Sequence, residues 1–221
     1  MGLAILLVAT IILSLCCYCL IKRRLLIAAK PSQYLRALAP VGWKQILCWI
    51  TIPLTLGSVA CMYYFFYKVS VLLILKRMLL LALTWPMAVT DLKEMRIPNK
   101  MILVGIGVRL AYLLPELLLT ENPLNIWKQE GIAAVIAGVL ALVCSLMSGG
   151  SLGAGDVKLV FVMGLFLGIQ PIFYCMFFSI FITFFYAIAV LVMKKKNKKD
   201  SIPFAPFILM GVFVAYILTG S

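Results

Sequence analysis

The chain has 221 residues, of which 65% are hydrophobic and only 12% are charged, and its mean hydropathy is +1.14. These values lie outside the usage of soluble globular domains and indicate a membrane protein with several spanning segments. The formal net charge of +13 does not point to a nucleic-acid partner, because most lysines and arginines fall in short loops between apolar runs, as the positive-inside rule describes.

The sequence contains no histidine. This excludes metalloproteases of the His-Glu-x-x-His kind, Ser-His and Cys-His catalytic pairs, and most catalytic zinc sites. Cys16 and Cys19 have a Cys-x-x-Cys spacing, but no second pair completes a zinc site. We interpret the seven cysteines as packing residues, and we expect neither a metal nor a cofactor.

The N-terminal part, residues 1–68, contains two apolar segments that are long enough to span a membrane, residues 3–21 and 46–66. Basic residues follow the first segment, which reverses the charge order of a secretory signal and predicts an anchor. The loop between the segments, residues 22–44, is basic and carries no acidic residue, so we expect it in the cytoplasm.

Residues 69–221 are predicted to form a second domain of further spanning helices. The expected spans are residues 69–90, 101–119, 131–147, 157–169, 171–193 and 203–218. Lys76 and Arg77 interrupt the first of them. With the N-terminal pair, these segments predict an all-α polytopic bundle of about eight transmembrane helices.

Two aspartates lie beside apolar segments. Asp91 directly follows the apolar residues 78–90, and Asp156 lies between the apolar residues 132–148 and 157–168. A charge at such a position is costly and indicates function. Two predicted spans separate the aspartates, so both face the same side of the membrane. The lysine-rich residues 194–199 make that side cytoplasmic.

The two carboxylates suit aspartic proteolysis. When two carboxyl groups lie close together, one keeps a proton while the other is ionised. The ionised group takes a proton from a water that attacks a peptide carbonyl, and the protonated group donates to the carbonyl oxygen. Gly153 and Gly155 lack Cβ atoms, so they would let an extended substrate backbone approach Asp156.

The glycine-rich segment also has other interpretations. Gly150-x-x-x-x-Gly155 is similar to the start of a phosphate-binding loop, but Asp156 occupies the position of the lysine and would repel phosphate. A plainer alternative is a flexible turn with Asp156 as a helix cap. Lys158 is either a residue near the substrate or a lysine that snorkels to the membrane surface.

Three segments carry a resemblance to one family. They are Asp91-Leu-Lys-Glu-Met-Arg-Ile-Pro-Asn99, Gly153-Ala-Gly-Asp156-Val-Lys-Leu159 and Pro203-Phe-Ala-Pro-Phe-Ile-Leu-Met-Gly211. In this order they resemble the motifs of the type IV prepilin peptidases, which are intramembrane aspartyl proteases. The similarity extends from about residue 78 to the C-terminus.

The resemblance implies that Asp91 and Asp156 are the catalytic pair. They would cut the leader from pilin-like precursors at the cytoplasmic face of the bacterial inner membrane, so the expected partners are these precursors and membrane lipid. Longer family members carry a methyltransferase domain with paired Cys-x-x-Cys motifs. Residues 22–44 contain no cysteine, so we expect a peptidase without methyltransferase activity. A different class, a proton- or cation-coupled transporter, would use the same acids but should show inverted repeats, and none is found.

Several other residues have structural interpretations. We expect Asn99 to cap the helix that it begins. Arg109 and Glu116 share one face of a helix at a spacing that we judge too large for a direct ion pair, so each is expected to pair across helices. Gly164 and Gly168 form a Gly-x-x-x-Gly pattern that predicts close helix packing.

Overall fold

The computed structural model describes five stretches of the chain, and every structural statement below refers to them: residues 8–14, 56–59, 70–147, 152–193 and 202–219. The chain divides into two compact units, Met1–Pro86 and Met87–Ser221. The predicted boundary between residues 68 and 69 stays a prediction, since most of the N-terminal segment lies outside the described residues.

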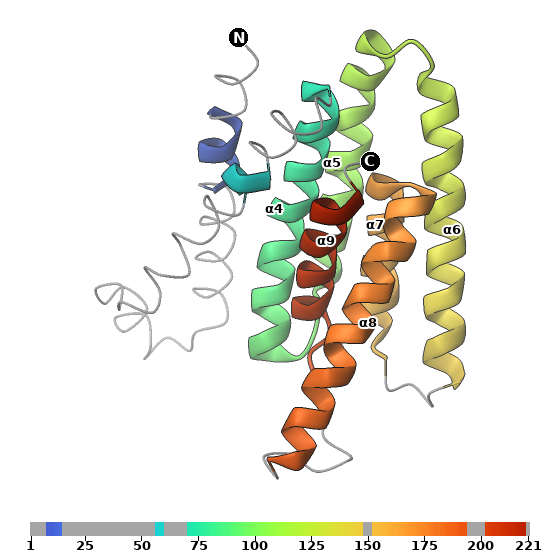
Figure 1. Cartoon of the computed structure of the whole chain (residues 1–221). Helices are drawn as coiled ribbons and strands as arrows, with labels where there is room; N and C mark the ends of the chain where they lie inside the picture. The colour runs from blue at the N-terminus through green and yellow to red at the C-terminus, as the bar shows by residue number, and fades with distance from the viewer. Residues whose placement is uncertain (1–7, 15–55, 60–69, 148–151, 194–201, 220–221) are drawn as a thin grey trace. The chain divides into compact units, whose positions relative to one another are not determined.

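All regular secondary structure in these stretches is helical, which confirms the all-α class (Figure 1). The main helices are α4 (Val71–Glu94), α5 (Asn99–Leu119), α6 (Pro123–Met147), α7 (Ala154–Leu167), α8 (Ile169–Val192) and α9 (Ala205–Thr219). Four of them, α4, α5, α6 and α8, are long and apolar enough to cross a membrane, and α9 is a shorter apolar helix. These helices agree with an integral membrane protein, while the total of about eight spans stays a prediction.

Helix α4 forms in spite of the two basic residues inside it. Lys76 and Arg77 were expected to interrupt the span, but both lie within the helix and are buried. The helix also continues past the apolar run, so Asp91 belongs to its last turn and does not begin a loop. The backbone of α4 therefore fixes the position of this carboxylate.

Helix α7 holds the unit Met87–Ser221 together, because it packs against α5, α6 and α8, and α8 packs in turn against α9. Gly164 of α7 lies so close to α6 that an added Cβ would be 2.4 Å from Ala134 Cα. At Gly211 of α9, a Cβ would be 2.6 Å from the backbone oxygen of Cys175 in α8. The predicted close packing at Gly164 is thus confirmed, since only glycine permits these approaches.

The prediction for Gly168 is wrong. This residue lies between α7 and α8 and has a φ of +80°. Residues other than glycine rarely adopt this backbone conformation. A Cβ there would meet its nearest atom, Glu130 Cγ, only at 3.9 Å. Gly168 is therefore required by a sharp turn between two helices and not by a close helix contact.

A buried ion cluster joins α5, α6 and α7. The Arg109 guanidinium donates to the carboxylate of Glu130 in α6, and it lies 2.8 Å from Glu116 Oε2 two turns further along α5. Arg109 Nε also donates to the backbone oxygen of Leu165 in α7 at 2.7 Å. All three charged residues are at most 5% exposed.

Two expectations about this cluster are corrected. Arg109 and Glu116 were thought too distant to pair, but two helical turns rise only about 10.5 Å, and the long side chains reach across that interval. The span expected to begin at residue 131 begins earlier, since α6 starts at Pro123 and places Glu130 inside the bundle.

Candidate active site

Asp91 is held by the beginning of α9. Its side chain is 5% exposed, and its Oδ2 accepts a hydrogen bond of 2.9 Å from the backbone N–H of Ala205, the first residue of α9. The first amides of a helix have no partner within the helix, so a carboxylate can satisfy one of them. Asp91 thereby connects two of the three segments that carry the family resemblance, although they are distant in sequence.

Asp156 lies in the first turn of α7, and its side chain is half-buried. The chain enters α7 through Gly153 in an extended conformation, and the Asp156 N–H donates to the Gly153 oxygen at 3.0 Å. Asp156 Oδ1 is buried and has no hydrogen-bond partner among the described residues. A carboxylate with such an oxygen is poorly stabilised as an anion, and it has a free position for a substrate or water.

The structure places the two predicted aspartates near enough for the charge of Asp91 to act on the Asp156 carboxyl group. Asp156 lies outside the four helices that could span a membrane. Burial, and then the nearby charge of Asp91, raise the pKa of the Asp156 carboxyl to about 6, although the hydrogen bond with the Gly153 backbone opposes them. A carboxyl group with this pKa holds a proton for part of the time near neutral pH, as a shared-proton pair requires.

A cavity of about 610 Å³ opens next to Asp156. Its wall comes from α6, α8 and the segment before α9, with large apolar side chains that include Leu140, Phe173, Ile180 and Phe204. Asp156 is the one charged residue that the described part of the chain contributes to this wall. An extended apolar chain can therefore lie in the cavity with one of its peptide bonds beside the carboxyl group.

The glycines next to Asp156 serve different contacts. At Gly153 an added Cβ would lie 3.3 Å from Asp156 Oδ2, so this glycine leaves room beside the carboxylate. A Cβ added at Gly155 would lie 3.1 Å from the Cβ of Ile97, which belongs to the loop that follows α4. Gly155 thus lets the segments that carry the two aspartates approach each other. The predicted approach of a substrate backbone to Gly153 and Gly155 stays a prediction.

Lys158 contacts the segment that follows Asp91. Its Nζ donates to Asn99 Oδ1 at 3.0 Å, and both side chains are exposed. The expectation that Asn99 caps α5 is wrong, since Pro98 occupies the N-cap position and no side chain makes a capping hydrogen bond. The amide of Asn99 instead accepts from Lys158. A role of Lys158 in substrate approach stays a prediction.

The contacts of Ala205 and Ile97 were not anticipated from the sequence. Ala205 acts through its backbone N–H, and Ile97 acts by packing against Gly155. Every residue except proline has a backbone N–H, so the residue type gives no signal.

The described residues also contain no group of three or more acidic or cysteine side chains arranged to hold a metal ion.

These observations define the class of the protein: an integral membrane protein of packed helices with a paired-carboxylate site at the ends of two of them. Comparison with known proteins then identifies the family. The model described as the type IV leader peptidase family matches residues 78–188, and the chain belongs to this family. The match confirms the resemblance that the three motifs indicated.

One similar protein is the prepilin leader peptidase/N-methyltransferase of Bacillus subtilis (strain 168), which is 35% identical over 133 residues. The aligned region covers 59% of this chain and 50% of the relative, so the chain spans about half the length of the curated relative that it matches. No solved structure matches the chain.

Proposed function

We propose that the chain is an intramembrane aspartic endopeptidase that removes the leader peptide from type IV prepilin-like precursors. The observation that carries the proposal is the electrostatic influence of Asp91 on Asp156, with Asp156 at the wall of an apolar cavity and its Oδ1 without a hydrogen-bond partner in the described part of the chain. Membership of the type IV leader peptidase family and the name of the Bacillus subtilis relative supply the substrate class.

The proposed mechanism uses one proton shared by the two carboxyl groups. With one group ionised and the other protonated, the ionised group removes a proton from water as the water oxygen attacks the carbonyl carbon of the scissile peptide. The protonated group donates to the carbonyl oxygen. The tetrahedral intermediate then breaks at the C–N bond, and the amine leaves with a proton. No covalent enzyme intermediate and no cofactor take part.

The proposed site of cleavage is the cytoplasmic face of the bacterial inner membrane. Asp156 lies at the beginning of α7, and α8 runs back from the far end of α7 after the turn at Gly168. The end of α8 therefore lies on the same side of the bundle as Asp156, and the lysine-rich residues 194–199 directly follow α8 in the sequence. Lysine clusters of this kind remain in the cytoplasm.

We propose peptidase activity without methyl transfer. The printed name of the relative includes N-methyltransferase, but the aligned region covers half of that protein. The paired cysteine motifs that the resemblance associates with methyl transfer have no counterpart in residues 22–44. Neither the family match nor the geometry favours the transporter alternative.

The test is cleavage of a purified prepilin-like precursor by the full chain in liposomes. Asp91→Asn and Asp156→Asn preserve side-chain size but cannot exchange protons, so each should lower the cleavage rate by about a thousandfold or more. Glu121→Gln is the matched control, because it makes the same change at an exposed carboxylate between α5 and α6. Near-normal cleavage by either aspartate variant would rule out the shared-proton mechanism.

A further inference from the structure

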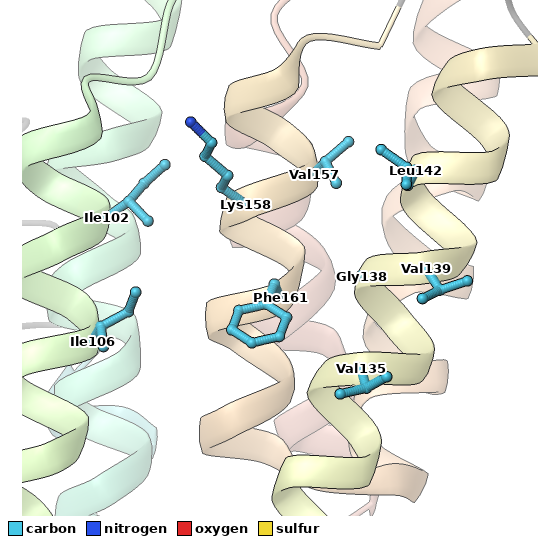
Figure 2. A pocket seen from close by; sticks show the side chains of 9 residues that line it. All are labelled: Ile102, Ile106, Val135, Gly138, Val139, Leu142, Val157, Lys158 and Phe161. Carbon is cyan, nitrogen blue, oxygen red and sulfur yellow. The ribbon is translucent and has the colours of Figure 1, made fainter.

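A second hollow lies between α5 and α6, with α7 as its floor (Figure 2). Its volume is about 400 Å³, and its wall includes Ile102 and Ile106 from α5, Val139 and Leu142 from α6, and Phe161 from α7. It differs from the cavity beside Asp156, whose wall comes from other residues of α6, from α8 and from the segment before α9. The proposed proteolysis assigns it no role.

At the floor of the hollow, α7 packs directly against α6. A Cβ at Gly138 of α6 would lie 3.1 Å from Phe161 Cδ2, so the aromatic ring rests directly against the α6 backbone. On the α6 side, Val139 is 52% exposed and Leu142 is 49% exposed. Both flanking helices are apolar enough to span a membrane, so the groove between them presents its apolar wall to the hydrocarbon of the bilayer.

Lys158 stands at one end of this groove. Figure 2 shows its ammonium group beyond Ile102 and Val157, at the end of α7 that also carries Asp156. Within the described residues its hydrogen bond is to the uncharged Asn99 side chain, which does not neutralise it. An ammonium group has three donors, so it can still bind an anion. Lys100, exposed at the beginning of α5, directly follows Asn99 in the chain and adds a second positive charge.

We propose that this groove binds an anionic phospholipid, with one acyl chain along Phe161 and Val139 and the phosphate at Lys158. The charge complementarity selects the occupant, because an apolar helix of a partner protein would leave the ammonium group without a counterion. The lipid would also shield the exposed apolar side chains of α6 along the groove. The proposal is independent of proteolysis, since it concerns a different surface and needs no substrate.

The test is lipid retention by the purified full chain, measured by native mass spectrometry in neutral detergent. Phosphatidylglycerol and phosphatidylcholine with identical acyl chains are added in turn. The wild type should retain phosphatidylglycerol about fivefold more tightly. Lys158→Gln should remove this preference and leave the weaker retention of phosphatidylcholine unchanged, and Lys158→Arg should preserve it. Lys128→Gln, an exposed lysine in α6 that is absent from the groove wall, is the charge control.

The groove itself is tested by filling it. Val139→Trp should abolish retention of both lipids, whereas Val143→Trp should not, because Val143 is 43% exposed on the same helix and does not line the groove. Equal retention of the two lipids by the wild type would overturn the proposal. Preferential binding of phosphatidylglycerol by Lys158→Gln, a variant that adds no bulk to the groove, would overturn it too. So would the finding that a second copy of the chain covers the groove in a dimer and excludes lipid.

Discussion

The unit Met87–Ser221 contains two groups of buried acidic side chains, and they differ in what surrounds them. Glu116 and Glu130 share the Arg109 guanidinium, which also donates to the backbone of α7. Asp91 and Asp156 have no ion-pair partner in the described part of the chain, and a cavity adjoins Asp156. The carboxylates of the first group share a cation, whereas those of the second have none and would be stabilised by a shared proton.

This difference distinguishes buried carboxylates that stabilise the fold from those that can take part in proton transfer. A buried carboxylate with a well-placed arginine is stabilised as an anion and becomes a fixed link between helices. Two carboxylates without a cation keep one proton between them, and that proton can move to a substrate. Acidic side chains therefore support packing at one end of α7 and, in our proposal, catalysis at the other.

The largest expected effect separates activity from stability at the carboxylate pair. Asp156→Asn should lower cleavage by about a thousandfold or more while the melting temperature stays the same or rises, because the substitution removes a like-charge repulsion. Rates of precursor cleavage and thermal unfolding are measured on the same preparation. A large fall in the melting temperature would show that Asp156 supports the fold, and the contrast between the two groups would fail.

The converse effect is expected at the ion cluster. Arg109→Met should lower the free energy of unfolding by about 3–5 kcal/mol, because Glu116 and Glu130 would remain buried without their cation. Arg96→Met is the matched control, since Arg96 is exposed in the loop after α4 and should change stability by less than about 0.5 kcal/mol. Denaturant unfolding in micelles measures both. Equal stability of the two variants would contradict a structural role for the cluster.

The sequence was informative wherever one apolar run corresponds to one helix. The expected spans correspond in order to the helices from α4 to α9, although α6 begins at Pro123 and not at residue 131. The placement of Asp91 and Asp156 on one face of the membrane stays a prediction. The correspondence depends on the cost of polar groups in hydrocarbon, which the sequence records directly. Contacts made by the backbone, such as that of Ala205 with Asp91, are absent from this record because every peptide group can make them.

The errors arose where side-chain reach or local conformation decides the outcome. The seven-residue spacing of Arg109 and Glu116 was judged from the helix backbone, but the length of an arginine side chain closes the interval. The Gly-x-x-x-Gly pattern fits Gly164, while Gly168 owes its identity to a positive φ that no spacing rule detects. Glu130 was left outside the span expected from residue 131, because polar residues interrupt the apolar pattern in the first turns of α6.

A third prediction asks whether close packing or the ion cluster holds α6 and α7 together. Gly164→Ala should cost about 1–3 kcal/mol, because the new Cβ would lie 2.4 Å from Ala134 Cα and force the helices apart. Gly107→Ala is the control: nothing lies within 4 Å of a Cβ there, and alanine favours the helix by about 0.5–1 kcal/mol. Unfolding free energies of both variants are compared. If Gly164→Ala is also stabilising, α6 and α7 must tolerate separation and the cluster alone holds them.

The smallest expected effect is a pH dependence that only the aspartate pair should show. The pKa of Asp156 is raised from 3.8 to about 6, so its protonated form is the one that the fold favours. Stability from this group is complete below pH 4 and is lost as the pH rises through about 6, and Asp156→Asn should remove that loss. Cleavage should fall about tenfold per pH unit above the same midpoint, because the pair then loses its shared proton. A cleavage rate that instead increases steadily above pH 6 would mean that both carboxylates act as anions. The proposal that Asp91 and Asp156 share a proton, in contrast to the carboxylates of the Arg109 cluster, would then be wrong.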